Sequence, residues 1–116
     1  YLLDEPSAHL DANARMEAAK AIKRTMESNE KAAMVIDHDI YFVDIVSDSL
    51  LVFEGEGGKQ GHAVGPLSLR KGMNRFLSGV GVTFRRDHES KRPRINKPGS
   101  VKDRGQKANG EYFYSD

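Results

Sequence analysis

The chain has 116 residues, of which 38% are apolar and 30% charged, with no cysteine, no tryptophan and a formal net charge of +1. This size and composition suit one soluble domain of a cytoplasmic protein, and the lack of cysteine excludes a disulfide framework or a thiolate metal site. The apolar runs are far shorter than the roughly 20 residues that a membrane-spanning helix needs, so we expect no membrane partner.

The first third of the chain predicts a strand, a helix and a second strand. Three apolar residues run into two acids and a proline, which cannot continue a strand. Asp11 is a favourable N-cap residue, and a helix is predicted from there to about Ser28. Its predicted buried face is a row of small or apolar residues at helical spacing: Ala14, Ala18, Ala21, Ile22, Thr25 and Met26. The run Ala32–Ile36 is typical of a parallel strand covered on both faces.

The middle of the chain predicts shorter elements. We expect a helix over Ile40–Val46 and a strand over Leu50–Phe53. A glycine-rich turn should follow, leading into a short strand near residues 62–64. A proline then precedes a predicted helix from Leu67 to about Leu77.

The residues after Gly79 differ from the rest in charge and pattern. Residues 1–78 carry nine Lys or Arg against twelve Asp or Glu, whereas residues 79–116 carry nine against five, a net charge of +4. Apolar residues are scattered here without a sustained period, so we predict an irregular basic arm with a short strand at Val82–Arg85.

The order strand, helix, strand predicts a βαβ unit, in which the two strands run parallel. Asp4 and Glu5 end the first strand and His38 follows the second, so all three should lie at the same sheet edge although 33 residues separate Glu5 from His38. Ligands of open α/β sheets bind outside that carboxyl edge. The candidate site is therefore an acidic pair with a neighbouring imidazole.

These residue types suit metal-assisted phosphoryl transfer to water. Asp4 would hold Mg²⁺ through its water shell, since Mg²⁺ takes only one or two carboxylates and keeps most of its waters. Glu5 would polarise the attacking water, and His38 would donate a hydrogen bond to the terminal phosphate.

The stretch "YLLDEPSAHLD" resembles the Walker B strand, catalytic glutamate and D-loop of an ATP-binding-cassette ATPase, and "VIDHD" resembles its switch-histidine segment. The resemblance implies Asp4 as the Mg²⁺ acid, Glu5 as general base and His38 as γ-phosphate sensor. The D-loop, which reaches the opposite nucleotide site in that family, would comprise Ser7, Ala8, His9, Leu10 and Asp11. Transporter members usually have a D-loop one residue shorter, because they lack the inserted His9.

The elements "FRRD", "RPRINK" and "KANGEYFYSD" resemble the carboxy-terminal end of the RNase L inhibitor family, the twin-cassette ATPases that split ribosomes. This resemblance implies a partial P-loop ATP-binding-cassette domain of α/β class over residues 1–78 and a hinge arm over residues 79–116. An amino-terminal iron–sulfur domain and a first cassette would precede this portion. The implied cofactors are ATP and Mg²⁺, and the implied partners are the rest of the domain, the opposing cassette, the small ribosomal subunit and ribosomal RNA.

The basic arm permits three interpretations: a solvated tail, a hinge packed on other protein, or a nucleic-acid contact. Its arginines have the chemistry for phosphate recognition, and the candidates are Arg85, Arg86, Arg92 and Arg94. Scattered apolar side chains argue against pure disorder and favour the hinge.

Several other patterns carry no function. "GEGGKQG" is not a P-loop, because Phe53 and Gln60 stand where glycine and a hydroxyl residue are required. "LSGVG" at residues 77–81 is read as a helix end, and His62 and His88 are assigned no role.

Two alternatives to the ribosome-splitting hypothesis stay open: a chromosome-maintenance or DNA-repair ATPase head, and a non-catalytic RNA-binding module. The chain does not begin with Met and opens inside an apolar strand, so we expect an upstream portion to be missing. Without a P-loop or signature motif, the piece alone should be inactive.

Overall fold

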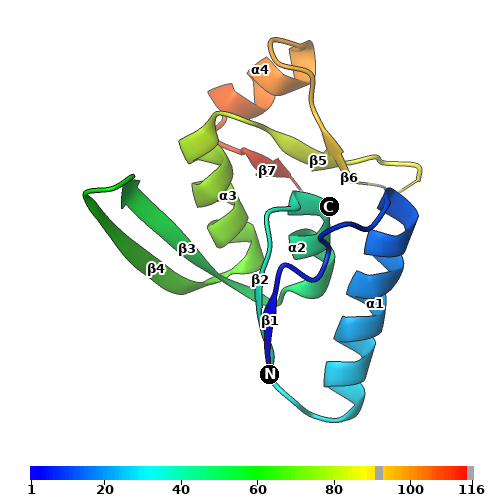
Figure 1. Ribbon diagram of the computed structural model, residues 1–116. Coiled ribbons are helices and arrows are strands. Elements are labelled where there is room, and N and C mark those ends of the chain that lie inside the picture. Colours follow the sequence, from blue (N-terminus) through cyan, green and yellow to red (C-terminus); the bar gives the residue numbers. More distant parts are fainter. Residues whose placement is uncertain (91–92, 115–116) are drawn as a thin grey trace. The chain divides into compact units, whose positions relative to one another are not determined.

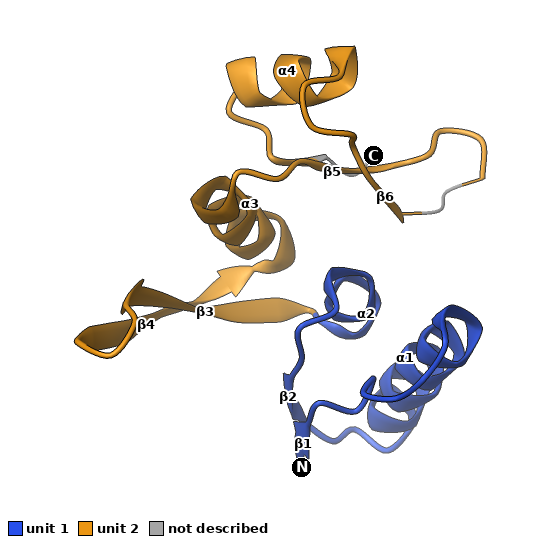
Figure 2. Ribbon diagram, turned by 45° about the horizontal axis from the view of Figure 1, so that its top comes forward, with its two compact units in different colours: residues 1–47 blue, residues 48–116 orange. Residues whose placement is uncertain are grey.

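A computed structural model describes residues 1–90 and 93–114 of the chain. It divides into two compact units, Tyr1–Ser47 and Asp48–Asp116 (Figure 2). Within the described residues, no helix combines the length and the apolar character that crossing a membrane requires.

The first unit is a βαβ arrangement with a second helix. Its elements are β1 (Leu2–Asp4), α1 (Ala12–Ser28), β2 (Met34–Ile36) and α2 (Ile40–Val46). β1 and β2 pair in parallel (Figure 1), as the sequence predicts, with Asp4 opposite Ile36. The bounds predicted for α2 agree with the structure, and β2 is two residues shorter than predicted.

Helix α1 begins where its cap residue predicts. The Asp11 carboxylate accepts a hydrogen bond from the backbone N–H of Ala14 at 2.7 Å, which satisfies one of the free amides at the start of the helix. Ala19 is fully buried, whereas Ala21 and Thr25 are exposed. The predicted buried face was wrong at these two positions, because the face that packs towards α2 is centred on Ala19.

The strand pair is less covered than the sequence predicts. Met34 and Ile36 are 52% and 49% exposed, and Leu2 is also exposed. Only Val35 of β2 is half-buried. The expectation of a strand covered on both faces is therefore not met within the described residues.

The second unit combines a hairpin, two helices and a small sheet. Its elements are β3 (Ser49–Glu56), β4 (Gln60–Ser68), α3 (Leu69–Val80), β5 (Phe84–Arg86), β6 (Pro93–Ile95), α4 (Val101–Ala108) and β7 (Phe113–Tyr114). β3 and β4 form an antiparallel ribbon whose turn points away from α3 (Figure 1). In the small sheet, β5 lies between β6, which is antiparallel to it, and β7, which is parallel.

Helix α3 begins two residues later than predicted, because β4 continues to its start. Leu67 and Ser68 still pair with β3, and the Ser68 hydroxyl then accepts a hydrogen bond from the Lys71 N–H. α3 packs closely on β3 at Gly72, where an added Cβ would lie 2.7 Å from the Leu50 Cβ.

The residues after Gly79 are more regular than the predicted irregular arm. Phe84 and Phe113 are buried and stack with ring centroids 5.2 Å apart. Beside them, the Thr83 hydroxyl donates to Asp103 and accepts from the Asn96 amide. The sequence showed no period here because the strands are two or three residues long and α4 is anchored by polar side chains.

Candidate functional site

The acidic pair and the histidine meet at one edge of the β1–β2 pair. The Glu5 N–H donates to the Ile36 carbonyl at 2.6 Å, which continues the parallel pairing one residue beyond the strands. The His38 Nε2 then lies 2.7 Å from the Glu5 carboxylate. The predicted juxtaposition is therefore present, brought about by parallel pairing across the α1 crossover.

These side chains are open to solvent. The Glu5 side chain is 46% exposed and that of His38 is 87% exposed, and Asp4 is exposed beside them. Glu5 has a φ of 48°, in the left-handed region that side-chain-bearing residues rarely adopt. Such local strain is found at functional sites more often than elsewhere, and here it lies at the predicted general base.

The loop after Glu5 contains the residues predicted as the D-loop. Ser7 is buried, with 4% of its surface exposed, and Leu10 is half-buried. Ala8 and His9 are exposed, and His9 has a φ of 65°. Asp11 is the N-cap of α1. The centre of the loop is therefore exposed, whereas its two ends are held by the buried Ser7 and by the N-cap Asp11.

Asp37 holds this loop, and the sequence analysis missed it. Its carboxylate accepts hydrogen bonds from the Ser7 N–H at 3.0 Å, from the Ser7 hydroxyl at 2.6 Å and from the Asp39 N–H at 3.0 Å. Burial alone would raise the pKa of Asp37, but these bonds and one from the His38 N–H outweigh it and lower that pKa. The available signal was the acid directly before the histidine in "DHD".

Asp39 is a second structural acid in the same segment. It accepts a hydrogen bond from the Phe42 N–H at 3.0 Å, as the N-cap of α2. Its other oxygen pairs with the Arg15 guanidinium on α1 at 2.7 Å. His38 therefore stands between two anchored acids. Asp37 is bonded to the D-loop at Ser7, and Asp39 is bonded to α1 and α2.

The carboxylates at this edge suit a Mg²⁺ ion that keeps most of its waters better than a metal ion enclosed by protein ligands. Within residues 1–90 and 93–114, no cluster of three or more potential metal-ligating side chains is present. Mg²⁺ does not need one, because it binds through one or two carboxylates, waters and substrate phosphates. The exposed Asp4 carboxylate next to Glu5 matches that donor set.

No protein-family model matches the chain. Individual proteins do match it along its whole length. It is 50% identical over 116 residues to an uncharacterized ABC transporter ATP-binding protein of Methanocaldococcus jannaschii, and 47% identical over 116 residues to translation initiation factor RLI1 of Saccharomyces cerevisiae. The chain spans 19% of the length of each of these relatives.

Solved structures show the same likeness. A crystal structure of an archaeal ribosome recycling factor, aABCE1, in complex with the ribosomal stalk protein aP1 superposes with a TM-score of 0.92 and 59% identity. A structure of RNase-L Inhibitor superposes with a TM-score of 0.91. Each superposition covers 98% of this chain and 22% of the other. The chain belongs to the RNase L inhibitor family.

Members of the RNase L inhibitor family are ABC proteins, and the mixed α/β fold agrees with the predicted partial ABC domain. The division into a cassette portion over residues 1–78 and a hinge over residues 79–116 stays a prediction. So do the individual roles assigned to Asp4, Glu5 and His38, although the structure brings these residues together.

Three of the arginines predicted for the arm lie on strands of the small sheet: Arg85, Arg86 and Arg94. Arg85 and Arg94 are opposite each other on β5 and β6. The Arg85 Nε donates to the Asn96 side chain at 2.8 Å, and the Arg94 Nε lies 3.3 Å from Asp87. Arg86 ends β5 and is half-buried, and Arg92 lies outside the described residues. Arg85 and Arg94 therefore have side-chain partners within this unit.

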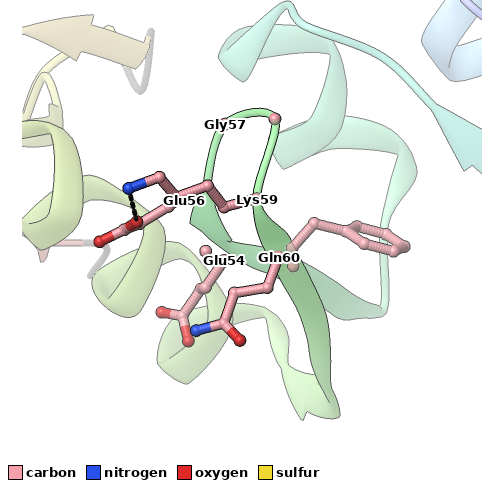
Figure 3. A pocket seen from close by; sticks show the side chains of 9 residues that line it. Glu54, Glu56, Gly57, Lys59 and Gln60 are labelled. Carbon is pink, nitrogen blue, oxygen red and sulfur yellow. Dashed lines mark ion pairs between the residues drawn. The ribbon is translucent and has the colours of Figure 1, made fainter.

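The two rejected motifs are ordinary structural features. "GEGGKQG" forms the β3–β4 turn, where residues 53–61 line a hollow of about 500 Å³ (Figure 3). No helix follows the turn as a P-loop requires, and the Lys59 amine lies 3.7 Å from the Glu56 carboxylate. "LSGVG" ends α3, with Gly81 as a left-handed cap.

Proposed function

We propose that the chain supplies the Walker B acid, general base and γ-phosphate sensor of an ATP-hydrolysing site in a twin-cassette ribosome-recycling ATPase. The observation that carries this proposal is the 2.7 Å contact between His38 and Glu5 at the shared edge of two parallel strands, beside Asp4. Ligands of open α/β sheets bind outside this carboxyl edge, which supports contact between these side chains and a nucleotide's terminal phosphate.

The proposed roles follow from the chemistry of each side chain. Asp4 would hold Mg²⁺ through its waters, and the bound ion would neutralise charge on the phosphates. Glu5 would accept a proton from the attacking water, and its neighbour His38 would donate a hydrogen bond to the γ-phosphate. The exposed part of the D-loop at Ala8 and His9 would reach towards the opposite nucleotide site, on the neighbouring cassette.

The relatives support ribosome recycling as the process that this hydrolysis drives. The matching structures include the archaeal recycling factor with a stalk protein and a model of archaeal ABCE1 with Pelota on the ribosome. We therefore assign a cytoplasmic parent protein that separates ribosomal subunits. The chain alone would not turn over ATP, because it contains half of the site.

The test is Glu5→Gln in the complete protein, with ATP turnover and nucleotide occlusion as readouts. Loss of the general base should lower kcat by about 10²- to 10⁴-fold and leave nucleotide trapped. The matched control is Glu17→Gln, which removes one carboxylate from the exposed side of α1 and should leave turnover unchanged. Turnover at the wild-type rate in Glu5→Gln would remove Glu5 from the mechanism.

A further inference from the structure

Asp37 lies next to the proposed site but has no role in the hydrolysis described above. It lies directly after β2 and directly before His38, and its carboxylate faces Ser7, two residues after Glu5. One oxygen accepts from the Ser7 hydroxyl and the Asp39 N–H, and the other accepts from the Ser7 N–H. The carboxylate therefore connects the chain segment that carries Glu5 with the one that carries His38.

This connection takes over where the strand pairing ends. The last backbone bond between the two segments runs from the Glu5 N–H to the Ile36 carbonyl. Beyond it, the segments diverge into the loop and α2, and the Ser7–Asp37 bonds are what join them next. On one segment Glu5 therefore lies between the backbone bond and the side-chain clamp at Ser7, and on the other His38 directly follows the clamp at Asp37.

The clamp matters because packing restrains the two functional side chains little. The His38 side chain is largely exposed and that of Glu5 is about half exposed, so their 2.7 Å separation depends on how their backbones are held. Ser7, in contrast, is buried, and bonds to an ionised acceptor in such a place are stronger than those between neutral groups. The lowered pKa of Asp37, which hydrogen bonds cause against the effect of burial, agrees with an ionised acceptor at neutral pH.

We propose that Asp37 is a positioning residue, which couples the D-loop through Ser7 to His38 and so sets the distance between His38 and Glu5. This inference rests on the proposed function, because it assigns Asp37 a part in the same hydrolysis. Asp39 has a different task, since its bonds go to Arg15 and to the start of α2. If the neighbouring cassette displaces the D-loop, the Asp37 carboxylate would transmit that movement to His38.

The test is a set of variants in the complete protein: Asp37→Asn, Ser7→Ala and His38→Ala, singly and in pairs. Asn at position 37 keeps the shape but places an N–H against one of the present donors, so at least one bond is lost. We expect kcat to fall about tenfold or more in Asp37→Asn with little change in the KM for ATP. Adding Asp37→Asn to His38→Ala, or to Ser7→Ala, should lower kcat much less than it does alone.

A control separates positioning from simple stabilisation. Ala19→Gly replaces a buried residue in the middle of α1 and weakens the same unit without removing a partner of the Ser7–Asp37 hydrogen bonds. It should lower the unfolding temperature and leave kcat at the assay temperature unchanged. If Asp37 has a structural role only, Asp37→Asn will behave like Ala19→Gly and its effect will add to that of His38→Ala.

The outcomes distinguish this inference from the proposed function. Wild-type kcat in Asp37→Asn, or full additivity with His38→Ala, together with an inactive Glu5→Gln, would overturn the role of Asp37 alone. Wild-type turnover in Glu5→Gln would overturn the proposed function and the role of Asp37 with it. Loss of kcat in Asp37→Asn that disappears in the His38→Ala background would support both.

Discussion

The two units of the chain differ in what they bury. In residues 1–47, Ala19 and Phe42 are the buried apolar residues, and the strand side chains Leu2, Met34 and Ile36 are exposed. In residues 48–116, a larger set of apolar side chains is buried: Val52, Met73, Leu77, Phe84 and Phe113. The unit with the candidate chemistry thus has few fully buried apolar side chains, whereas the other has a larger apolar core.

Each unit contains an acid that accepts several hydrogen bonds, half-buried in the first unit and buried in the second, but the two acids have different roles. Asp37 in the first unit joins the loop at Ser7 to the segment that carries His38. Asp103 in the second unit is 2% exposed and joins Thr83 to the start of α4 through Gly99. The comparison separates an acid that positions a site from one that stabilises a fold.

Phe84→Ala should have the largest effect on stability and should fall on the second unit. Its ring is fully buried against Phe113, so truncation should cost about 3–5 kcal/mol in the free energy of unfolding. Urea titration and amide exchange over residues 84–113 measure this loss. The same change at Phe53, which is 76% exposed, should cost within about 0.5 kcal/mol. Equal losses at the two positions would contradict the assigned core.

Asp103→Asn should have a smaller effect that depends on pH. The Thr83 hydroxyl and the Gly99 N–H hold the pKa of Asp103 below its ordinary value of 3.8. A lowered pKa in the folded state means that the stabilisation is complete above pH 3.8 and is lost as the pH falls through the folded-state value. The unfolding temperature of Asp103→Asn should therefore lie below wild type at pH 7 and approach it in acid.

The control for this pH series is Glu89→Gln, a change at an exposed acid of the same unit. Its unfolding curve should follow wild type at every pH. A difference between Asp103→Asn and wild type that persists or grows in acid would show that the carboxylate charge is not the stabilising feature.

Arg94→Glu should have the smallest effect on the fold and should act instead on binding. Its side chain is 54% exposed and its contact to Asp87 is long, so the variant should remain folded. If the arm contacts ribosomal RNA, which is one of the three interpretations of the basic arm, the affinity of the complete protein for ribosomes should fall and the slope of its salt dependence should decrease by about 1. Unchanged binding across the salt series would exclude Arg94 from the contact.

The elements of the first unit could be predicted well because each has a local signal. Asp11 and Asp39 stand at helix starts, and the apolar runs before "DE" and "DHD" mark two strand ends that parallel pairing must place together. The Asp37 clamp could not be predicted from periodicity, since it depends on where the loop after Glu5 folds.

The second unit was harder to predict because its regularity depends on contacts between distant residues. Helix α4 contains Val101, which is 77% exposed, and is anchored by Asp103 and Gln106 rather than by an apolar stripe. Strand β7 is two residues long and pairs with β5 across a long stretch of sequence. A short stretch of sequence shows neither the polar anchoring of α4 nor the pairing of β5 with β7. The segment therefore has the sequence pattern of an irregular arm.

The pairing of Asp4 with Ile36 has a consequence for how the length of this chain can vary. A residue added between α1 and β2, at positions 29–33, changes only the path of a connection and leaves the register intact. A residue added between Met34 and Asp37 would shift everything after it by about 3.3 Å and turn it to the opposite face. Functional descendants of this sequence should therefore tolerate insertions in the former place and reject them in the latter.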